Sequence, residues 1–354
     1  MNAGMMNDEC GMMNDECRMM NDESGMGAKP SVALRHSALT TSNASHFHIS
    51  HSALKNKTLI VIAGPTASGK TAFSIELAKA LNTVILSADS RQFYKEMSIG
   101  TAAPTEEELN QVKHYFVHHI GIGDKYDVAD YERDAIVLLD ELFKTHDTVI
   151  MTGGSGLFID AICNGIDEMP DVTSEIRDKV QNLYDEGGLK ALQDEVQRLD
   201  PEYYAIVDQQ NPRRLQRALE VCYQTGRTFT SFRSGHAVQR DFEIKKYALL
   251  WDRQELIERI DKRVDMMMQQ GLLEEAKALY PMRHLNALNT VGYKELFAYF
   301  DGQCSLDEAV EQIKIHTRQY AKRQMTWLRK DNSYQWIMPE DFDSTLSDLR
   351  QALA

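Results

Sequence analysis

One short segment carries residue types that could bind a phosphate. Residues 64–71 read GPTASGKT and fit the pattern G-x-x-x-x-G-K-[ST]. Glycines in this pattern let backbone N–H groups turn towards an anion, and the helix that follows adds the positive end of its dipole. The segment therefore predicts a diphosphate or triphosphate site, without specifying nucleotide hydrolysis. The predicted phosphate-binding residues are Gly64, Pro65, Thr66, Ala67, Ser68, Gly69, Lys70 and Thr71.

Two of these side chains have separate expected roles. Lys70 would place a positive charge against the terminal phosphate, and Thr71 would hold Mg²⁺ through its hydroxyl group. A third group, Asp89, follows at the carboxyl end of the next expected strand. The carboxyl ends of parallel strands border the crevice in which α/β proteins bind ligands. In a nucleotide-hydrolysing protein this aspartate could bind Mg²⁺, and in an ordinary turn it would cap a helix, so the position alone leaves its role open.

The elements around these residues predict an α/β fold with a parallel sheet. A P-loop has to follow a buried strand and open a helix, and both flanks of residues 64–71 meet this requirement. Strands that alternate with helices imply a parallel sheet that is covered on both faces. The expected elements are strands over residues 58–64, 83–89 and 148–156 and helices over residues 71–81 and 131–147.

The pattern changes twice along the chain. Charged helical stretches dominate from about residue 170 to 225, a strand returns at residues 245–252, and long helices then run to about residue 329. We therefore expect a P-loop NTPase-like core in two parts, 57–169 and 244–354, and a helical insertion over 170–243. Residues 1–56 contain three MMNDE repeats and a Ser/His/Ala-rich stretch, which predict a disordered leader or a start assigned too far upstream.

The composition of the chain is that of a soluble globular protein. It is 43% hydrophobic and 26% charged, and its longest apolar runs are strand-sized, so we expect no membrane segment. The five cysteines are scattered without a CxxC pair, which suits a reducing cytoplasm and gives no zinc or disulfide signal. A net charge of −14 argues weakly against a nucleic-acid partner, so local clusters have to decide.

Two local clusters of basic residues contradict the global charge. Arg213, Arg214 and Arg217 lie within five residues of one another. Such clusters can follow the phosphates of a nucleic acid, and interleaved aromatic side chains can stack on its bases. The second cluster comprises Arg318, Lys322, Arg323, Arg329 and Lys330, with Tyr320 and Trp327 interleaved. For the C-terminal cluster, the alternative interpretation is a solvated basic helix face with Trp327 in the core.

Several motifs in sequence order resemble one enzyme family. The segments GPTASGKT, DSRQFYKEMSIGTA, GGSGLF, NPRRLQRALEV, TVGYKEL and HTRQYAKRQMTWLRK resemble the tRNA dimethylallyltransferases and span residues 59–330. The resemblance implies transfer of a dimethylallyl group from dimethylallyl diphosphate, with Mg²⁺, to the N6 amine of the adenosine next to the anticodon, position 37. The partner would be a tRNA anticodon stem-loop, and we expect a cytoplasmic monomer.

The resemblance also implies a role for each matching residue. Residues 64–71 would hold the diphosphate together with Arg263, and Asp89 would accept the proton from the amine. Ser155 stands where the family usually has threonine, and it keeps a hydroxyl group near the reacting centre. The family usually has glutamine at the position of Arg213. The residues implied to contact tRNA are Asp89, Ser90, Arg91, Gln92, Ser155, Arg177, Arg213, Arg214, Leu215, Gln216 and Arg217.

Three other functions remain open from the sequence. An adenylate isopentenyltransferase, which prenylates free AMP, ADP or ATP, would share the P-loop and the base but would not need both the insertion and the basic C-terminal helix. An ATP-binding small-molecule kinase would need an adenine site and a mobile lid with phosphate-binding arginines. A non-catalytic RNA-binding protein with this fold is disfavoured by the intact Lys70, Thr71, Asp89 and Arg263.

The composition of the leader generates a prediction. Deletion of residues 1–55 should leave transferase activity and the thermal unfolding temperature nearly unchanged, because this segment has too few apolar residues to join a core. Activity assays and thermal melts of the full and truncated chains test this. A loss of solubility or activity on truncation would show that the segment packs or binds.

Overall fold

The computed structural model describes residues 57–233, 235 and 238–353. The predicted disordered leader, 1–56, lies outside these residues. The described chain divides into two compact units, one formed by residues 57–168 and the chain after 233, the other by residues 169–233. The sequence placed the inserted segment at 170–243. Over the described residues, no helix combines the length and apolar character that a membrane span requires.

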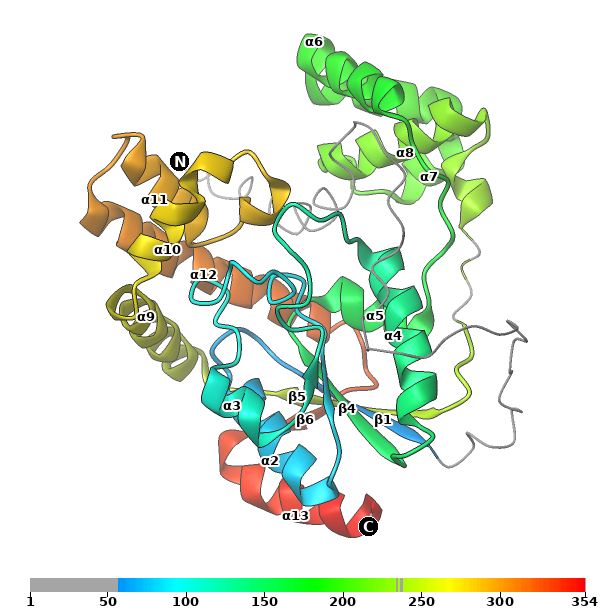
Figure 1. The fold of residues 1–354 in the computed structure, drawn as a ribbon. Helices are drawn as coiled ribbons and strands as arrows, with labels where there is room; N and C mark the ends of the chain where they lie inside the picture. Colours follow the sequence, from blue (N-terminus) through cyan, green and yellow to red (C-terminus); the bar gives the residue numbers. More distant parts are fainter. Residues whose placement is uncertain (1–56, 234, 236–237, 354) are drawn as a thin grey trace, which may run out of the picture. The chain divides into compact units, whose positions relative to one another are not determined.

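The first unit is built on a parallel sheet, shown at the centre of Figure 1. Within the described residues the strand order is β3-β2-β4-β1-β5-β6, and all neighbouring strands are parallel. This confirms the predicted α/β class. The strands are β1 (Thr58–Ala63), β2 (Ile85–Ser87), β3 (His114–Tyr115), β4 (Thr148–Gly153), β5 (Glu243–Leu249) and β6 (Gln335–Ile337).

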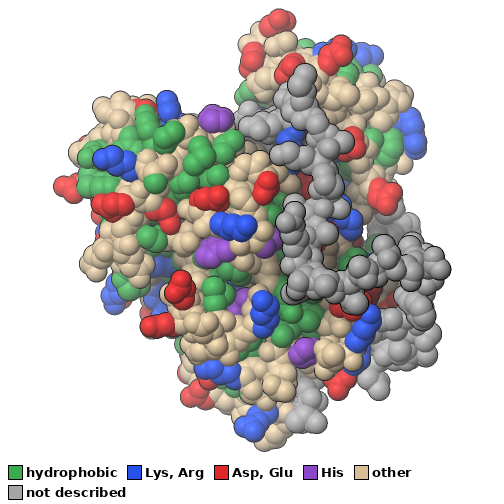
Figure 2. All heavy atoms as spheres, in the orientation of Figure 1, with side chains coloured by type: hydrophobic (Ala, Val, Ile, Leu, Met, Phe, Trp, Pro, Cys, Tyr) green, Lys and Arg blue, Asp and Glu red, His purple; other side chains and the backbone are tan. Residues whose placement is uncertain are grey.

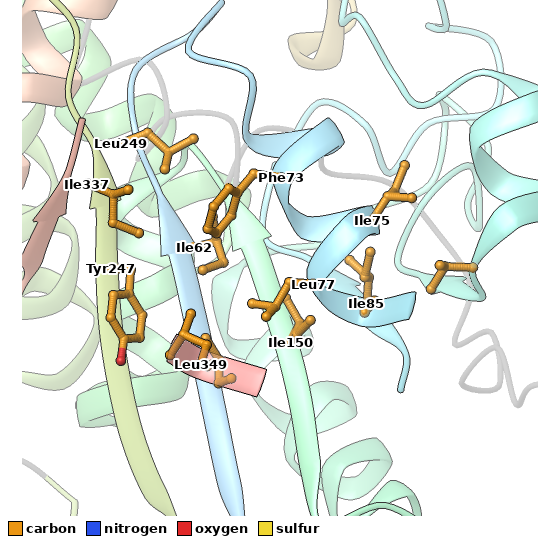
Figure 3. Close-up of a cluster of buried hydrophobic side chains, with 13 residues drawn as sticks. Ile62, Phe73, Ile75, Leu77, Ile85, Ile150, Tyr247, Leu249, Ile337 and Leu349 are labelled. Atoms are coloured by element: carbon orange, nitrogen blue, oxygen red, sulfur yellow. The ribbon is translucent and has the colours of Figure 1, made fainter. Parts of the chain in front are cut away.

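Strand β1 lies between β4 and β5, and every one of its residues is buried. Alternate side chains of a strand point to opposite faces, so a strand covered on both faces is apolar throughout. Ile60 and Ile62 belong to a core cluster on one face (Figure 3). Helix α2 (Lys70–Leu81) supplies Phe73 and Leu77 to the same cluster. Because β1 is fixed from both sides, the loop at its carboxyl end is fixed as well.

Aromatic residues hold the strand that leads to Asp89. Tyr131 of α4 (Val128–Leu142) is fully buried, and its hydroxyl donates to the Ser87 carbonyl oxygen at 3.1 Å. Its ring stacks on Phe93 at 5.4 Å between centroids and lies 5.2 Å from Phe158 of α5 (Gly156–Asn164). Helix α4 begins before the expected residue 131 because Asp127 caps its first turn.

The C-terminal part of the first unit contains elements that the sequence analysis did not anticipate. β6 has three residues, too few to show a period, and helix α13 (Phe342–Leu353) follows it. Phe342 of α13 packs edge-on against Phe73 of α2 at 5.2 Å, so the end of the chain covers the same face of the sheet. The remaining α-helices described in this unit are α3 (Glu106–Gln111), α9 (Arg253–Gln269), α10 (Leu272–Leu279), α11 (Tyr293–Phe300) and α12 (Leu306–Leu328). Its 3-10 helices are η2 (Tyr280–Met282), η3 (Asn286–Leu288) and η4 (Pro339–Asp341).

The second unit is helical and has its own core. Helix α6 is interrupted at Gly188, where φ is 62°, and α8 begins at an Asn211 cap followed by Pro212. Leu192, Leu215 and other apolar side chains of these helices form the core. The elements of the unit are α6 (Ser174–Leu199), α7 (Pro201–Ile206), α8 (Pro212–Thr225) and the 3-10 helix η1 (Phe229–Phe232).

The close approach of β4 to the end of β2 generates a prediction. A Cβ atom on Gly153 would lie 2.3 Å from the Ala88 carbonyl oxygen, so Gly153→Ala should lower the free energy of unfolding by about 1–3 kcal/mol. Gly123→Ala is the control, because a Cβ atom there meets nothing within 4 Å. Urea denaturation of both variants measures the difference. Equal stability of the two variants would contradict the close approach.

Candidate active site

A cavity of about 1340 Å³ opens in the first unit, at the carboxyl ends of β1, β2 and β4. This edge of a parallel sheet is where α/β proteins bind ligands. The cavity is lined by the P-loop, the turn that contains Asp89, the loop at residues 98–106 and side chains of α9 and α12. Lys70, Asp89 and Arg263, which lie far apart in the sequence, therefore line one space.

The P-loop has a backbone suited to an anion. Ala67 and Gly69 have φ values of 63° and 88°, in the left-handed region, and helix α2 begins directly after Gly69. The Ser68 side chain is fully buried, and its Oγ has no hydrogen-bond partner among the described residues. A buried hydroxyl without a partner is costly unless a ligand satisfies it. The loop therefore has the geometry of a phosphate cradle.

Gln324 of α12 ties the P-loop to the neighbouring strand end. Its Oε1 accepts a hydrogen bond from the Thr66 N–H at 2.8 Å, and its Nε2 donates to the Gly154 carbonyl oxygen at 2.9 Å. The side chain is buried, so both bonds are shielded from water. The sequence analysis did not identify Gln324 as a site residue. A glutamine at a buried position of a long helix is the feature that could have indicated it.

Arg259 and Trp251 hold the other side of the P-loop. The Arg259 Nε donates to the Ala67 carbonyl oxygen at 2.8 Å, and its guanidinium lies 4.0 Å from the centre of the Trp251 ring. The Trp251 Nε1 donates to the Ser68 carbonyl oxygen at 2.9 Å. The sequence analysis missed Arg259, although it lies four residues before Arg263 and so shares its face of α9.

Lys70, Arg263 and Asp89 influence one another electrostatically within the cavity. Lys70 donates from Nζ to the carbonyl oxygens of Gly64 at 2.9 Å and Pro65 at 2.8 Å. Burial and, to a smaller extent, the Arg263 charge lower the pKa of Lys70 to about 7, whereas Asp89 opposes this shift. Burial likewise lowers the pKa of Arg263, with Asp89 again acting in the opposite direction. Such a pair of cations favours an anion between them.

The Asp89 carboxylate is fixed by its own turn. Its Oδ1 accepts a hydrogen bond from the Arg91 N–H at 3.1 Å, and the side chain is half-buried in the cavity lining. Arg91 and Gln92 line the same cavity. Gln92 is held from both ends, because Ser87 donates to its Oε1 at 3.2 Å and its Nε2 donates to the Ala102 carbonyl oxygen at 3.2 Å. The turn therefore presents a carboxylate and an amide in fixed positions.

Ser90 and Ser155 are buried and are not among the described residues that line the cavity. The Ser155 Oγ accepts a hydrogen bond from the Ser90 N–H at 3.2 Å and lies 3.2 Å from the Ser90 Oγ. The Ser155 hydroxyl thus braces the turn that carries Asp89, and its effect on the cavity is indirect.

The other residues implied to contact RNA belong to the second unit. Leu215 is fully buried in the helical core, and Gln216 is buried between Arg213, which donates to it at 3.0 Å, and Gln181 at 3.1 Å. Arg214 is exposed, whereas Arg217 is half-buried and lies 3.5 Å from Glu220. Within this stretch, Arg214 thus presents its side chain most openly to solvent. The remaining residue, Arg177, is half-buried in the first turn of α6.

The basic residues of the C-terminal helix are partly engaged within the protein. Arg318 forms a bidentate ion pair with Asp261 at 2.9 and 2.5 Å. Trp327 donates from Nε1 to Asp160 at 3.1 Å and packs over Gly156, so it is a structural residue rather than an exposed stacking platform. Helix α12 ends at Leu328, before Lys330. Where described residues are visible in Figure 2, basic and acidic side chains are interspersed.

A parallel sheet with a P-loop after its central strand, and a carboxylate that lines the same cavity as that loop, are typical of P-loop α/β proteins. Comparison with known sequences is more specific. Residues 92–331 match the model of the family described as IPP transferase. The chain is 50% identical over 297 residues to tRNA dimethylallyltransferase 1 of Bacteroides fragilis, a match that covers 84% of this chain and 99% of that protein. It is also 50% identical over 291 residues to tRNA dimethylallyltransferase of Christiangramia forsetii, covering 82% and 95% of the two chains.

Solved structures give the same result. The tRNA isopentenylpyrophosphate transferase of Bacillus halodurans is 33% identical with a TM-score of 0.61, over 84% of this chain and 96% of that one. A eukaryotic dimethylallyltransferase acting on tRNA is 23% identical with a TM-score of 0.68, over 83% and 78%, which supports the fold. The chain belongs to the IPP transferase family, and the predicted family is confirmed.

The buried position of Lys70 generates a prediction about pH. The unfolded lysine has the ordinary pKa of 10.5 and the folded one a pKa of about 7, so between these values the unfolded chain binds the extra proton. Stability rises with pH wherever the unfolded state binds more protons. The free energy of unfolding of the wild type, relative to Lys70→Met, should therefore rise from about pH 7 towards pH 10.

Urea denaturation at several pH values provides the measurement. Lys79→Met, which changes an exposed lysine of the same helix, is the matched control and should follow the wild type. A difference between wild type and Lys70→Met that stays constant with pH would contradict the buried, cation-facing position of Lys70.

Proposed function

We propose that this protein transfers the dimethylallyl group of dimethylallyl diphosphate to the N6 amine of the adenosine next to the anticodon of a tRNA, position 37, giving N6-isopentenyladenosine. The observation that carries the proposal is a single cavity lined by a P-loop with two cations and by the carboxylate of Asp89. Such a cavity has a place for an anionic leaving group and a place for a proton acceptor. Membership of the IPP transferase family supports the same reaction.

The donor half of the reaction uses the P-loop. The carbon–oxygen bond to the diphosphate breaks, and negative charge accumulates on the bridging oxygen. Backbone N–H groups of residues 64–71, the Lys70 ammonium and the Arg263 guanidinium would stabilise that charge. Lys70 would move from the carbonyl oxygens of Gly64 and Pro65 to the diphosphate as the donor binds. Tight packing around the allylic carbon would exclude water, which otherwise hydrolyses the donor.

The acceptor half uses Asp89. An exocyclic adenine amine is a weak nucleophile because its lone pair is delocalised into the ring. A carboxylate that accepts a hydrogen bond from N6–H sharpens the amine and takes the proton as the carbon–nitrogen bond forms. The hydrogen bond from the Arg91 N–H to the Asp89 Oδ1 holds the carboxylate in position to accept this proton. The products are the N6-prenylated adenosine, free diphosphate and a proton on Asp89.

The residues present fit a magnesium ion held mainly by the donor. Thr71 lines the cavity directly after Lys70, and its hydroxyl oxygen is a ligand of the kind Mg²⁺ accepts. The described residues contain no group of three or more acidic, histidine or cysteine side chains that could hold a metal. We therefore propose that Thr71 and the diphosphate oxygens would hold Mg²⁺, which neutralises charge on the leaving group.

The acceptor has to be an unpaired adenine. A base stacked in a duplex cannot reach a carboxylate inside a cavity, whereas a base in an anticodon loop can be extruded at a cost of a few kcal/mol. Arg91 and Gln92 would contact the extruded base. In the second unit, the exposed Arg214 would contact the tRNA. We propose that the protein acts in the cytoplasm as a monomer.

The choice of acceptor is the test of this proposal. The protein is incubated with Mg²⁺ and dimethylallyl diphosphate labelled in the prenyl chain, with either unmodified tRNA or AMP as the acceptor. Label on tRNA supports the proposal. Label on AMP alone would replace it with an adenylate isopentenyltransferase, and label on neither acceptor would remove it.

The role of Asp89 generates a prediction. Asp89→Asn keeps the shape of the side chain but removes the proton acceptor, so the single-turnover rate with saturating donor and tRNA should fall by roughly 10²–10⁴-fold. RNA affinity should change little. Asp171→Asn, an exposed carboxylate of the second unit, serves as control. Asp89 is not the base if the Asp89→Asn rate stays within a few-fold of that control.

A further inference from the structure

The carboxylate of Glu275, on α10, is bound by three consecutive backbone N–H groups of a distant loop. Ser98 and Ile99 donate to Oε2 at 3.0 and 2.8 Å, and Gly100 donates to Oε1 at 2.9 Å. The Tyr293 hydroxyl donates to the same Oε1 at 2.6 Å. Hydrogen bonds to a charged acceptor are roughly twice as strong as neutral ones, so this cluster holds the loop firmly.

The loop is shaped around this cluster. A Cβ atom on Gly100 would lie 2.6 Å from the Tyr293 ring, so glycine is needed for the close approach. Burial and the Glu275 charge raise the pKa of Tyr293, which keeps its hydroxyl protonated and able to donate. Within the loop, Ala102 has φ 46° and its N–H donates to the Ile99 carbonyl oxygen at 2.9 Å. The backbone thus folds back on itself on top of Glu275 and Tyr293.

The same loop forms part of the cavity wall. Residues 98–103 all line the cavity, whereas Glu275 and Tyr293 are absent from the described residues that do so. On its other side the loop receives the Gln92 amide, which donates to the Ala102 carbonyl oxygen at 3.2 Å. A continuous set of hydrogen bonds therefore runs from Glu275 through the loop to Gln92. Gln92 belongs to the same turn as Asp89.

We propose that Glu275, assisted by Tyr293, is a positioning residue for the acceptor side of the reaction. By fixing the backbone of residues 98–102 it fixes Gln92 and the wall against which the acceptor adenine lies. The proposal rests on the proposed function for what the pocket receives, and on the hydrogen bonds alone for what holds the loop. The four hydrogen bonds of Glu275 given above involve no P-loop residue, so its loss should affect the acceptor and leave the donor site intact.

Glu275→Ala, Glu275→Gln and Tyr293→Phe are compared with Glu274→Gln, which changes the exposed neighbour on the same helix. Three quantities are measured: amide hydrogen exchange of a peptide covering residues 97–103, the Kd for inorganic diphosphate, and kcat and KM for an anticodon stem-loop with labelled donor. Glu275→Ala should speed exchange in that peptide and lower kcat/KM for the RNA by roughly 10–100-fold. The diphosphate Kd should stay within about two-fold.

The conservative variants add a graded readout. Glu275→Gln keeps one oxygen acceptor, and Tyr293→Phe keeps the ring beneath Gly100, so both should lose less activity than Glu275→Ala. Exchange rates and RNA kinetics of Glu275→Ala that match Glu274→Gln would overturn the proposal. So would an equal loss of diphosphate affinity and RNA turnover, because that pattern indicates general destabilisation. If the wild type labels no RNA, the proposed function fails, and hydrogen exchange alone decides whether Glu275 holds the loop.

Discussion

Two positive side chains, Lys70 and Arg263, lie half-buried in one cavity, and the arrangement of the site depends on them. Removing a charge from water costs several kcal/mol unless another charge or a set of hydrogen bonds compensates it. Asp89 compensates part of this cost, as its opposing effect on both pKa values indicates. The remaining positive charge is suited to an anion that arrives and leaves. The buried Gln324 and the Arg259 side chain stacked over Trp251 hold the P-loop backbone in place around this charge. The buried residues of the neighbouring strands support that backbone from below.

The features of the site that the sequence predicts are those formed by residues close together in the chain. A P-loop is recognisable because its glycines, lysine and flanking strand and helix lie within a few residues of one another, and Asp89 because it follows a short buried strand. The bonds that brace these parts are not local. Gln324 reaches Thr66 across 258 positions, and Glu275 reaches Gly100 across 175. No periodicity or motif specifies such a partner. The hydrogen bond between the Ser90 N–H and the Ser155 Oγ, 65 positions apart, is another contact that the sequence does not specify.

Part of the negative charge of the chain is paired with arginines of the basic clusters. The net charge is −14, yet the reaction requires positive charge where an anion binds. Some arginines that the sequence presented as basic clusters neutralise acidic neighbours, as Arg318 does with Asp261 and Arg217 with Glu220. These two arginines are therefore partly neutralised within the protein, whereas Lys70 and Arg263 line the cavity. Recognition of an RNA by such a protein would depend on the shape of a pocket for one extruded base more than on a broad positive surface.

In the proposed reaction the P-loop binds a leaving group and transfers no phosphate. The most direct test uses dimethylallyl diphosphate labelled with ¹⁴C in the prenyl chain and ³²P in the diphosphate, incubated with the protein, Mg²⁺ and unmodified tRNA. The account predicts ¹⁴C on the RNA and all ³²P in free inorganic diphosphate, without any need for ATP. Recovery of ³²P on the acceptor, or a requirement for stoichiometric ATP hydrolysis, would contradict it.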